Sequence, residues 1–193
     1  ESPVADAQLL IIASNFFKEL QIDIQIQINS IGCKECRAEY VKKLVSFYKE
    51  RGKRTKLCND CKKRLVKNPL RMLDCKEEDC TEIREDAPQI VDFLCEPCRE
   101  HFVKVLEYMD EFDVPYSLNS HLVRGLDYYN RTVFEFTTKD KEPEEGEENV
   151  SRKQLSLGGG GRYDSLVEFM GGIEPTPVLG FGIGIERVIM KIK

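Results

Sequence analysis

Eight cysteines in four pairs constrain the fold of this chain more than any other sequence feature. A Cys-x-x-Cys pair presents two thiolates within one turn of chain, the usual spacing in structural zinc sites. We expect the first two pairs, 21 residues apart, to share one tetrahedral zinc ion and the last two to share a second. Reduced free thiols are the alternative, and disulfides are less expected because nothing marks the chain as secreted. The pairs are Cys33 and Cys36, Cys58 and Cys61, Cys75 and Cys80, and Cys95 and Cys98.

The composition is that of a globular protein. Of the 193 residues, 41% are hydrophobic and 33% are charged, which suits one ordinary domain or two small ones. No apolar run approaches the roughly 20 residues of a membrane helix, and no leader resembles a signal peptide. We therefore expect a cytoplasmic protein that does not contact membranes. Because the chain begins with glutamate and not methionine, we also expect it to be a piece of a longer protein.

Charge is distributed unevenly along the chain, behind a net charge of -5. Residues 34–71 carry 14 basic and 4 acidic side chains, whereas residues 72–150 carry 8 basic and 22 acidic ones. A basic block of this density can contact phosphates and bind nucleic acid without reading its sequence. The alternative is a solvated helical surface.

Apolar periodicity predicts both helices and strands. Ser2 and Pro3 are typical of a helix start, and apolar residues at helical spacing continue to Leu20. Residues 22–28 alternate isoleucine with polar residues, which predicts a half-buried strand. Further strands are predicted over residues 132–138, from 154 and over 178–185, with helices over 163–170 and from 186, and a charged hairpin or disordered loop over 139–153.

All eight cysteines lie in a segment of different composition. It contains two helix patterns, one around Leu44 and one around Val105, with helix breakers between them. Strands joined by hairpins, with helices to one side, indicate the α+β class. We predict three regions: a first part of a core over residues 1–30, a Cys-rich, mainly helical insertion over 31–116, and a second part of the core over 117–193.

Three motifs contain residue types suited to a small polar ligand and a nucleotide. Arg124 offers a permanent charge and a planar fork of donors, which suits a carboxylate or a phosphate. Tyr128 and Tyr129 offer rings and hydroxyls, although they point to opposite faces if the segment is extended. Glycines over residues 158–161 and 180–184 leave room for a ligand or another backbone. The alternatives are a surface arginine, tyrosines packed in a core, and a flexible glycine linker.

These motifs resemble the signatures of the histidyl-tRNA synthetases, which are class II aminoacyl-tRNA synthetases. Residues 122–135 resemble the first histidine signature, residues 157–164 the second, and residues 180–187 class II motif 3. The opening residues 1–7 are similar to those that follow motif 2 in the bacterial enzymes, so the resemblance covers nearly the whole chain. It implies part of the class II antiparallel sheet and an insertion domain that clasps the acceptor arm of tRNA(His).

The resemblance also implies roles for single residues in the activation of histidine by ATP with Mg²⁺. Arg124 is the implied catalytic residue, in contact with the α-phosphate and the histidine carboxylate, and Arg187 is expected to contact the γ-phosphate and cover the adenine. Any zinc is expected to be structural, because some family members lack these cysteines. The implied histidine-binding residues are Arg124, Tyr128, Tyr129, Gly159, Gly160 and Tyr163, and the implied ATP-binding residues are Arg124, Gly182, Gly184 and Arg187.

Motif 1, which builds the homodimer interface in this family, is not found in the sequence, nor are the motif 2 strands and the anticodon-binding domain. We therefore expect the chain alone to be inactive or nearly so. One alternative is the synthetase-like regulatory subunit of histidine biosynthesis, which binds histidine but generally lacks the insertion. Another treats residues 31–116 as an independent, zinc-dependent RNA-binding module.

Overall fold

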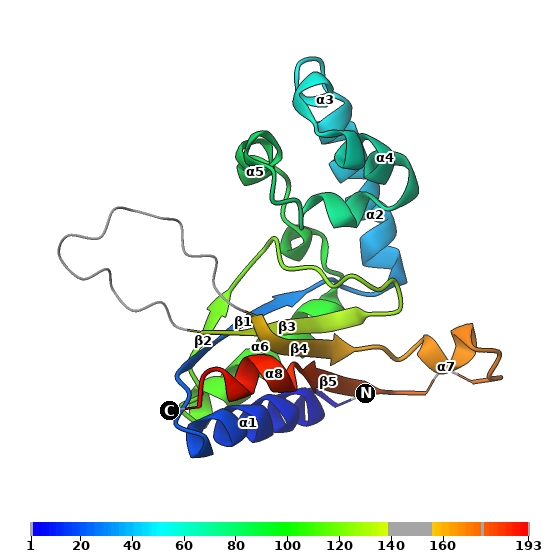
Figure 1. Cartoon of the computed structure of the whole chain (residues 1–193). Helices are drawn as coiled ribbons and strands as arrows, with labels where there is room; N and C mark the ends of the chain where they lie inside the picture. The colour runs from blue at the N-terminus through cyan, green and yellow to red at the C-terminus, as the bar shows by residue number, and fades with distance from the viewer. Residues whose placement is uncertain (1, 139–155, 175, 193) are drawn as a thin grey trace, which may run out of the picture.

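A five-stranded sheet lies at the centre of the computed structural model, which describes residues 2–138, 156–174 and 176–192. The strand order is β2-β1-β3-β4-β5 (Figure 1). The short strand β2 was not predicted; it runs parallel to β1 because the long insertion connects the two, and the other neighbours are antiparallel. The strands are β1 (Ile24–Ser30), β2 (Tyr116–Leu118), β3 (Asn130–Thr138), β4 (Ser156–Arg162) and β5 (Leu179–Ile183).

The isoleucine alternation in β1 follows from the different environments of the two faces of the sheet. Ile26 and Ile28 are buried, and they stand opposite Phe136 and Phe134 of β3 in a core shared with the helices. On the other face, β3 presents Glu135 toward a pocket. The predicted strand and the α+β class are confirmed.

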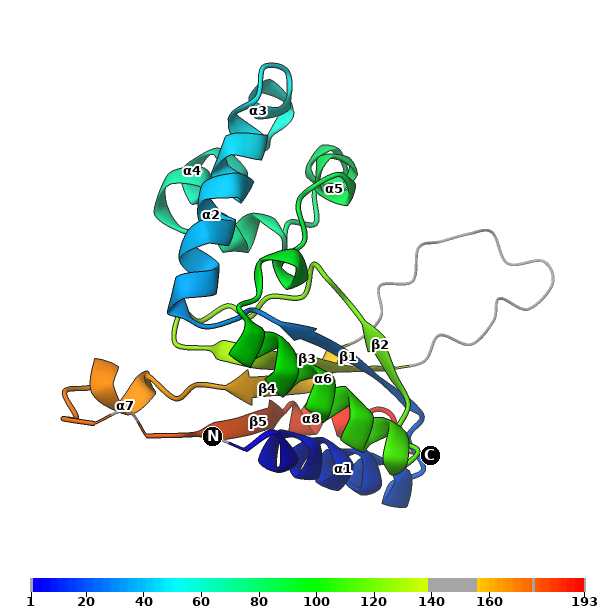
Figure 2. The same cartoon turned by 180° about the vertical axis from the view of Figure 1, so that it is seen from behind.

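Two helices, α1 (Pro3–Glu19) and α6 (Glu96–Glu111), lie side by side against the buried face (Figure 2). As predicted, α1 begins after Ser2, whose hydroxyl accepts a hydrogen bond from the Val4 N–H at 3.3 Å. The helix buries Leu10, Ala13 and Phe17. The apolar spacing that ends at Leu20 also includes Ile12 and Phe16, but these two are exposed, by 61% and 42%, because the helix is rotated so that residues 10, 13 and 17 meet the sheet.

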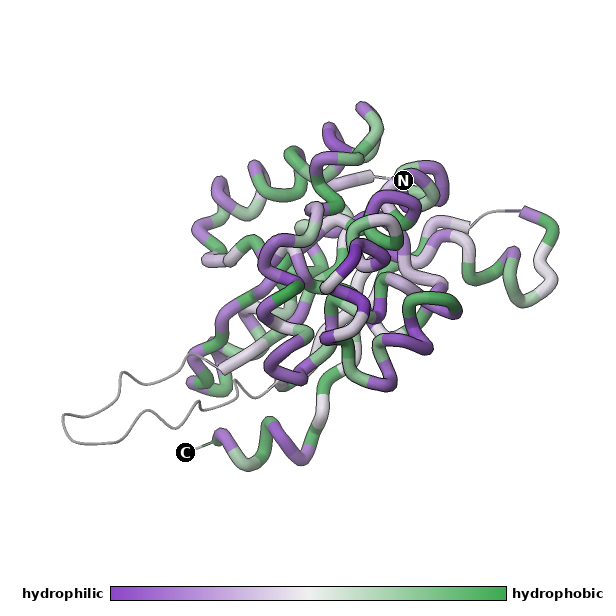
Figure 3. Tube along the Cα trace, turned by 90° about the horizontal axis from the view of Figure 1, so that it is seen from above, coloured by the Kyte–Doolittle hydropathy of each residue, from purple (hydrophilic) through white to green (hydrophobic). Residues whose placement is uncertain are grey.

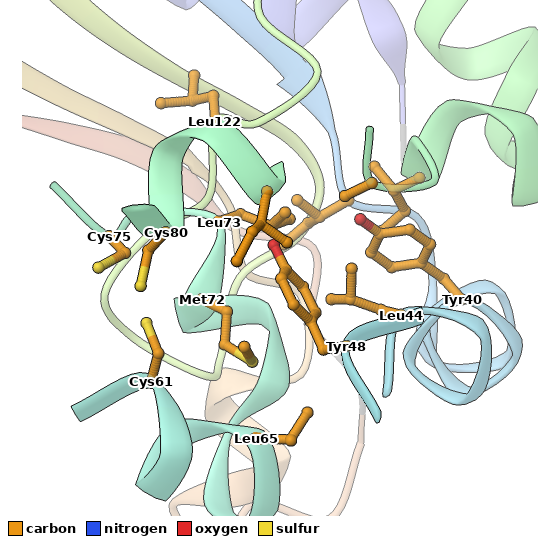
Figure 4. Close-up of a cluster of buried hydrophobic side chains, with 14 of the residues drawn as sticks. Tyr40, Leu44, Tyr48, Cys61, Leu65, Met72, Leu73, Cys75, Cys80 and Leu122 are labelled. Atoms are coloured by element: carbon orange, nitrogen blue, oxygen red, sulfur yellow. The ribbon is translucent and has the colours of Figure 1, made fainter. Parts of the chain in front are cut away.

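The helices of the insertion project away from the sheet (Figure 1). Their core is built by Tyr40, Leu44 and Tyr48 of helix α2 (Lys34–Lys49), which pack with Met72 and with cysteine side chains (Figure 4). Seen from above, hydrophilic and hydrophobic residues alternate along the helical turns of the molecule, as expected for helices that bury one side (Figure 3). The insertion contains α2 (Lys34–Lys49), α3 (Lys53–Lys56), α4 (Asn59–Lys67), α5 (Glu78–Glu85) and the 3-10 helices η1 (Pro69–Met72) and η2 (Ile90–Phe93).

Helix α6 packs differently from the other helices of the predicted insertion. Its residues Phe102, Val105 and Met109 belong to the same core as α1 and the sheet. The division of the chain at residues 31 and 116 stays a prediction. The packing of α6 favours an insertion that ends near residue 95, before the predicted end at residue 116.

The region after β3 differs from its sequence-based prediction in two ways. The four consecutive glycines lie within β4, where each pairs with a residue of β3 and of β5. The helix predicted over residues 163–170 is reduced to α7 (Leu166–Phe169), because the Tyr163 N–H donates to the Val178 carbonyl at 2.8 Å and prolongs the sheet pairing. The predicted final helix is present as α8 (Ile185–Ile189), while the loop predicted over 139–153 lies outside the described residues.

The helices of the described ranges include none with both the length and the apolar character required to cross a bilayer.

A buried ion cluster joins β4 to the helical layer. The guanidinium of Arg162 is 1% exposed and donates to the carboxylates of Asp6 on α1, at 2.5 Å, and Asp164, at 3.0 Å. His101 of α6 lies 3.3 Å from the Asp6 carboxylate. Burial by itself raises the pKa of Asp6, but the hydrogen bonds from His101 and Arg162 outweigh it and leave that pKa lowered. The cluster therefore ties both helices to the strand that carries the glycines.

Replacing Asp6 by asparagine is expected to destabilise the chain by about 3–5 kcal/mol, because Arg162 would keep its charge in a buried site with half of its partners. Urea unfolding at pH 7 measures this loss. Because the folded-state pKa of Asp6 lies below its ordinary value of 3.8, its contribution is present above that pH and disappears as the pH falls through the folded-state pKa. The Asp6→Asn variant should therefore lose its disadvantage in strong acid, and a constant difference at all pH values would contradict this explanation.

Candidate functional site

One cavity of about 490 Å³ on the open face of the sheet is lined by eight of the nine residues predicted to bind histidine or ATP. Only Gly160 of that set does not line it. The cavity lies over β4 and β5, between the loop that precedes β3 and the start of α8. Its lining residues are Arg124, Tyr128, Tyr129, Glu135, Ser156, Leu157, Gly158, Gly159, Tyr163, Gly180, Phe181, Gly182, Gly184 and Arg187.

Arg124 crosses the cavity from the loop between β2 and β3. Its Nη1 atom is 3.9 Å from the Glu135 carboxylate, and its guanidinium carbon is 5.9 Å from the centre of the Tyr129 ring. A Cβ atom on Gly159 would lie 2.6 Å from the Phe134 carbonyl oxygen and 2.8 Å from Arg124 Nη1, so glycine fits between the β3 backbone and this arginine. Because the Glu135 carboxylate is 3.9 Å away, beyond hydrogen-bond distance, the Arg124 guanidinium keeps hydrogen-bond donors for an anionic ligand.

Three tyrosine rings form one wall of the cavity. Tyr128 and Tyr129 have ring centroids 4.7 Å apart, and Tyr163 lies edge-on to both, at 5.5 Å and 5.8 Å. The segment containing the first two tyrosines is a turn and not an extended strand, so both side chains reach the same cavity. Burial, together with the neighbouring Tyr129, raises the pKa of Tyr128, which keeps its hydroxyl protonated and able to donate. Such a wall can hold a flat, polar ring.

The glycines of β4 have different roles on the two faces of the strand. Gly159 pairs with Glu135 and Gly182 and lies on the cavity side. Gly160 pairs with Phe134 and Phe181, and a Cβ atom there would lie 2.6 Å from the Phe181 Cα. Gly160 therefore permits close strand packing on the covered face and does not line the cavity.

The β5 end of the cavity has an open floor and a second arginine. A Cβ atom on Gly182 would meet nothing within 4 Å, so this strand presents bare backbone to the cavity, as the alternation of glycines predicted. Arg187, from α8, donates to the Ser156 carbonyl at 2.7 Å. A Cβ on Gly184 would lie 3.3 Å from the Arg187 Cδ, so this glycine gives the arginine room. A flat ligand with an anionic tail would fit between the open floor and this arginine.

Two polar residues of the cavity were not predicted. Glu135 faces Arg124 from β3, and the Ser156 hydroxyl donates to the Glu135 carboxylate at 2.5 Å. The alternation of β3 places Glu135 on the opposite side from Phe134, which was a usable signal. The place of Ser156 in the cavity could be predicted only from the pairing of β4 with β3.

The cysteines form two clusters, but their pairing differs from the prediction. Within each cluster the sulfur atoms lie within 4.8 Å of one another. The prediction that the first two pairs share a site is wrong, because α2 carries the second pair away from the first and the chain returns beside Cys33 only at Cys95. The base cluster is Cys33, Cys36, Cys95 and Cys98, and the outer cluster is Cys58, Cys61, Cys75 and Cys80.

The geometry of each cluster fits a tetrahedral thiolate site. Four sulfurs about 2.3 Å from a zinc ion would be about 3.8 Å apart. The sulfur–sulfur distances in the structure are 3.4 Å for Cys33 and Cys36, 3.9 Å for Cys33 and Cys95, and 3.8 Å for Cys58 and Cys75. Backbone N–H groups also donate to sulfur, including Cys95 N to Cys36 Sγ at 3.1 Å. Either cluster can therefore bind a metal ion.

Most of the basic block lies on the outer surface of α2, α3 and α4. Its exposed members there include Lys42, Lys49, Arg54, Lys63 and Lys67. Arg37 and Arg71 point inward instead, and their guanidiniums donate to the Tyr129 and Gly125 carbonyls beside the cavity.

Comparisons with known proteins agree on one group of relatives, although no family model matches the chain. The histidine–tRNA ligase of Caldicellulosiruptor bescii is 46% identical over 193 residues, all of this chain and 43% of that protein. That of Caldicellulosiruptor saccharolyticus is 47% identical over the same shares. The apo histidyl-tRNA synthetase of S. aureus superposes with a TM-score of 0.72 and 31% identity, covering 99% of this chain and 44% of that one. The chain thus spans about 43% of the length of these curated relatives.

The α+β sheet and its helical layer match the fold of the class II aminoacyl-tRNA synthetases. The predicted resemblance is confirmed: this chain is similar over its whole length to one segment of the histidine–tRNA ligases. An ATP phosphoribosyltransferase regulatory subunit/histidyl-tRNA synthetase from Bacillus halodurans, at 15% identity and a TM-score of 0.56, shares the fold.

Proposed function

We propose that the cavity binds histidine and ATP as part of a histidine–tRNA ligase, which forms histidyl-adenylate and transfers histidine to tRNA(His). The observation that supports this most is the convergence of Arg124, the three tyrosines and the bare glycine floor in one cavity. The similarity to histidine–tRNA ligases at 46% and 47% identity supports the same activity.

The proposed roles follow from the charge and shape of the cavity. Arg124 brings the histidine carboxylate to the α-phosphate and stabilises the charge that develops there. Tyr128, Tyr129 and Tyr163 surround the imidazole, with rings as flat walls and hydroxyls for its nitrogens. Gly159 keeps space for the arginine, and Glu135 limits its motion.

ATP is proposed to lie over β5, with its adenine between the backbone of Gly182 and the side chain of Arg187. The guanidinium would also neutralise part of the triphosphate charge, in cooperation with Mg²⁺ supplied with the nucleotide. Gly160 has no direct role in this proposal, because it supports the strand pairing beneath the cavity.

The remaining partners are also proposals. The exposed lysines and arginines of the insertion suit the phosphates of the tRNA acceptor arm. A homodimer and a cytoplasmic location are expected by analogy with the relatives. The chain alone is expected to show little or no histidine-dependent pyrophosphate exchange.

We propose that each cysteine cluster holds one structural zinc ion. The four-sulfur geometry and the N–H donors to sulfur support this use. Zinc would supply folding energy to the insertion, whose apolar core includes buried cysteines of the outer cluster, and would take no part in the chemistry of the cavity. The nearby His101 lies against Asp6 and belongs to neither cluster.

A histidine-binding regulatory subunit is the second candidate. Its support is limited to the shared fold of the Bacillus halodurans protein. The intact insertion, with its basic surface, favours the ligase.

A chimaera provides the functional test. In this chimaera, the chain replaces the matching segment of the Caldicellulosiruptor bescii histidine–tRNA ligase, and that ligase supplies the rest of the protein. Replacing Gly182 by alanine in it is expected to raise the KM for ATP about tenfold, because the methyl group would occupy the nucleotide surface. Stability should change by no more than about 0.5 kcal/mol, since a Cβ atom there meets no neighbour.

Gly160→Ala is the matched comparison. Its methyl group would enter the β5 backbone, so unfolding and not nucleotide binding should be affected. An unchanged KM for ATP in Gly182→Ala would contradict the proposed nucleotide position.

A further inference from the structure

The base cluster joins the insertion to the sheet. Cys33 is the residue before α2, where the chain leaves β1, and Cys95 is the residue before α6, where the chain returns. A single ion held by the four thiolates would therefore fix the exit and re-entry points of the insertion together.

Helix α2 connects the base cluster to the tyrosine wall through Arg37. This residue directly follows Cys36, and its guanidinium donates to the Tyr129 carbonyl at 2.7 Å. Because Tyr129 is 7% exposed and packs against Tyr128 and Tyr163, a displacement of its backbone would move the wall.

A second connection runs through the backbone just before the cluster. The Ile31 N–H donates to the Arg131 carbonyl at 2.8 Å, and the Arg131 N–H donates to the Gly32 carbonyl at 2.9 Å. Gly32 has a φ of 63°, and a Cβ atom there would lie 2.6 Å from the Cys36 Cβ. Only glycine lets the chain turn this tightly against the cysteine.

We propose that a metal ion in the base cluster positions the Tyr128–Arg131 segment, so that its occupancy controls how tightly the cavity holds histidine. Arg37 is the positioning residue in this coupling. The link to histidine rests on the proposed histidine site, whereas the link from the metal to the backbone rests on the proposed occupancy of the base cluster.

The outer cluster provides a matched control. Its neighbouring residues contact the same loop at other points, since Asn68 donates to the Asp127 carboxylate at 2.5 Å and Arg71 to the Gly125 carbonyl at 3.0 Å. The Arg131 backbone is instead hydrogen-bonded to Ile31 and Gly32, beside the base cluster.

The test compares Cys95→Ser with Cys75→Ser in the whole 193-residue chain. Zinc content is measured by plasma mass spectrometry and exchange of the Arg131 amide by NMR. Cys95 is the exposed ligand of the base cluster, so its replacement by serine buries no hydroxyl group. Each variant should lose one zinc ion, and Cys95→Ser should speed exchange of the Arg131 amide about tenfold or more, because its hydrogen bond opens locally. Cys75→Ser should leave that amide unchanged.

Arg37→Ala tests the coupling without removing metal. In the chimaera it should retain both zinc ions and raise the KM for histidine about tenfold with kcat within about twofold, with partial rescue by Arg37→Lys. A base cluster without zinc, an unchanged Arg131 amide in Cys95→Ser, or an unchanged KM in Arg37→Ala would each overturn the proposal. A wild-type chimaera that shows no histidine dependence would instead overturn the proposed function, and the exchange measurement would still decide the coupling.

Discussion

Removing zinc from the chain is expected to unfold helices α2 to α5 while the sheet and α1 remain folded. Structural zinc sites contribute about 10–16 kcal/mol of apparent binding free energy, more than a small domain can lose. The insertion depends on this contribution because Cys61, Cys75 and Cys80 of the outer cluster are buried within its apolar core, so losing the ion would disrupt that core. The sheet has a separate apolar core shared with α1 and α6.

The measurement is hydrogen exchange of residues 34–94 before and after treatment with a strong zinc chelator, alongside zinc analysis. Two zinc ions per chain, and loss of protection confined to the insertion, are expected. Cys75→Ser should lose protection chiefly around α4 and α5, which carry the outer cluster. A metal-free chain whose insertion keeps its protection would show that the cysteines are free thiols.

Replacing Arg124 by alanine in the chimaera is expected to lower kcat for histidine-dependent pyrophosphate exchange by about 10²–10³, the usual loss when a donor to developing charge is removed. Arg124→Lys should recover only part of it, because an ammonium lacks the planar fork. Stability should change little, since the ion pair of Arg124 with partly exposed Glu135 is long, at 3.9 Å.

Arg54→Ala serves as the control, because Arg54 is an exposed arginine on α3, far in sequence from the cavity residues. It removes one positive charge without touching the cavity and should leave exchange unchanged. Equal losses in both variants would indicate a general effect of charge, and full activity in Arg124→Ala would remove Arg124 from the mechanism.

Local patterns in the sequence were sufficient for the main elements and for most of the cavity. The isoleucine alternation identified β1, and the three motifs identified residues that the fold brings together although they lie up to 63 positions apart, from Arg124 to Arg187. Gly160 could not be separated from Gly159 in advance, because the face of a strand to which a glycine belongs depends on the register with β3 and β5.

The cysteine pairing could not be predicted for a related reason. Spacing along the chain favours neighbouring pairs, but α2 carries the chain away from Cys33 and Cys36 before the second pair occurs. Arg162 also gave no signal, because its burial depends on Asp6, more than 150 positions earlier. Both features are set by long-range packing, which a local pattern does not contain.

The most direct test of the central claim is the amino-acid dependence of pyrophosphate exchange by the chimaera. The proposed cavity predicts that histidine stimulates exchange and that other amino acids do not, with the chain alone inactive or nearly so. Exchange that is absent with histidine in a folded chimaera, or equal with an amino acid that lacks an imidazole, would contradict the proposal that this cavity selects histidine for activation.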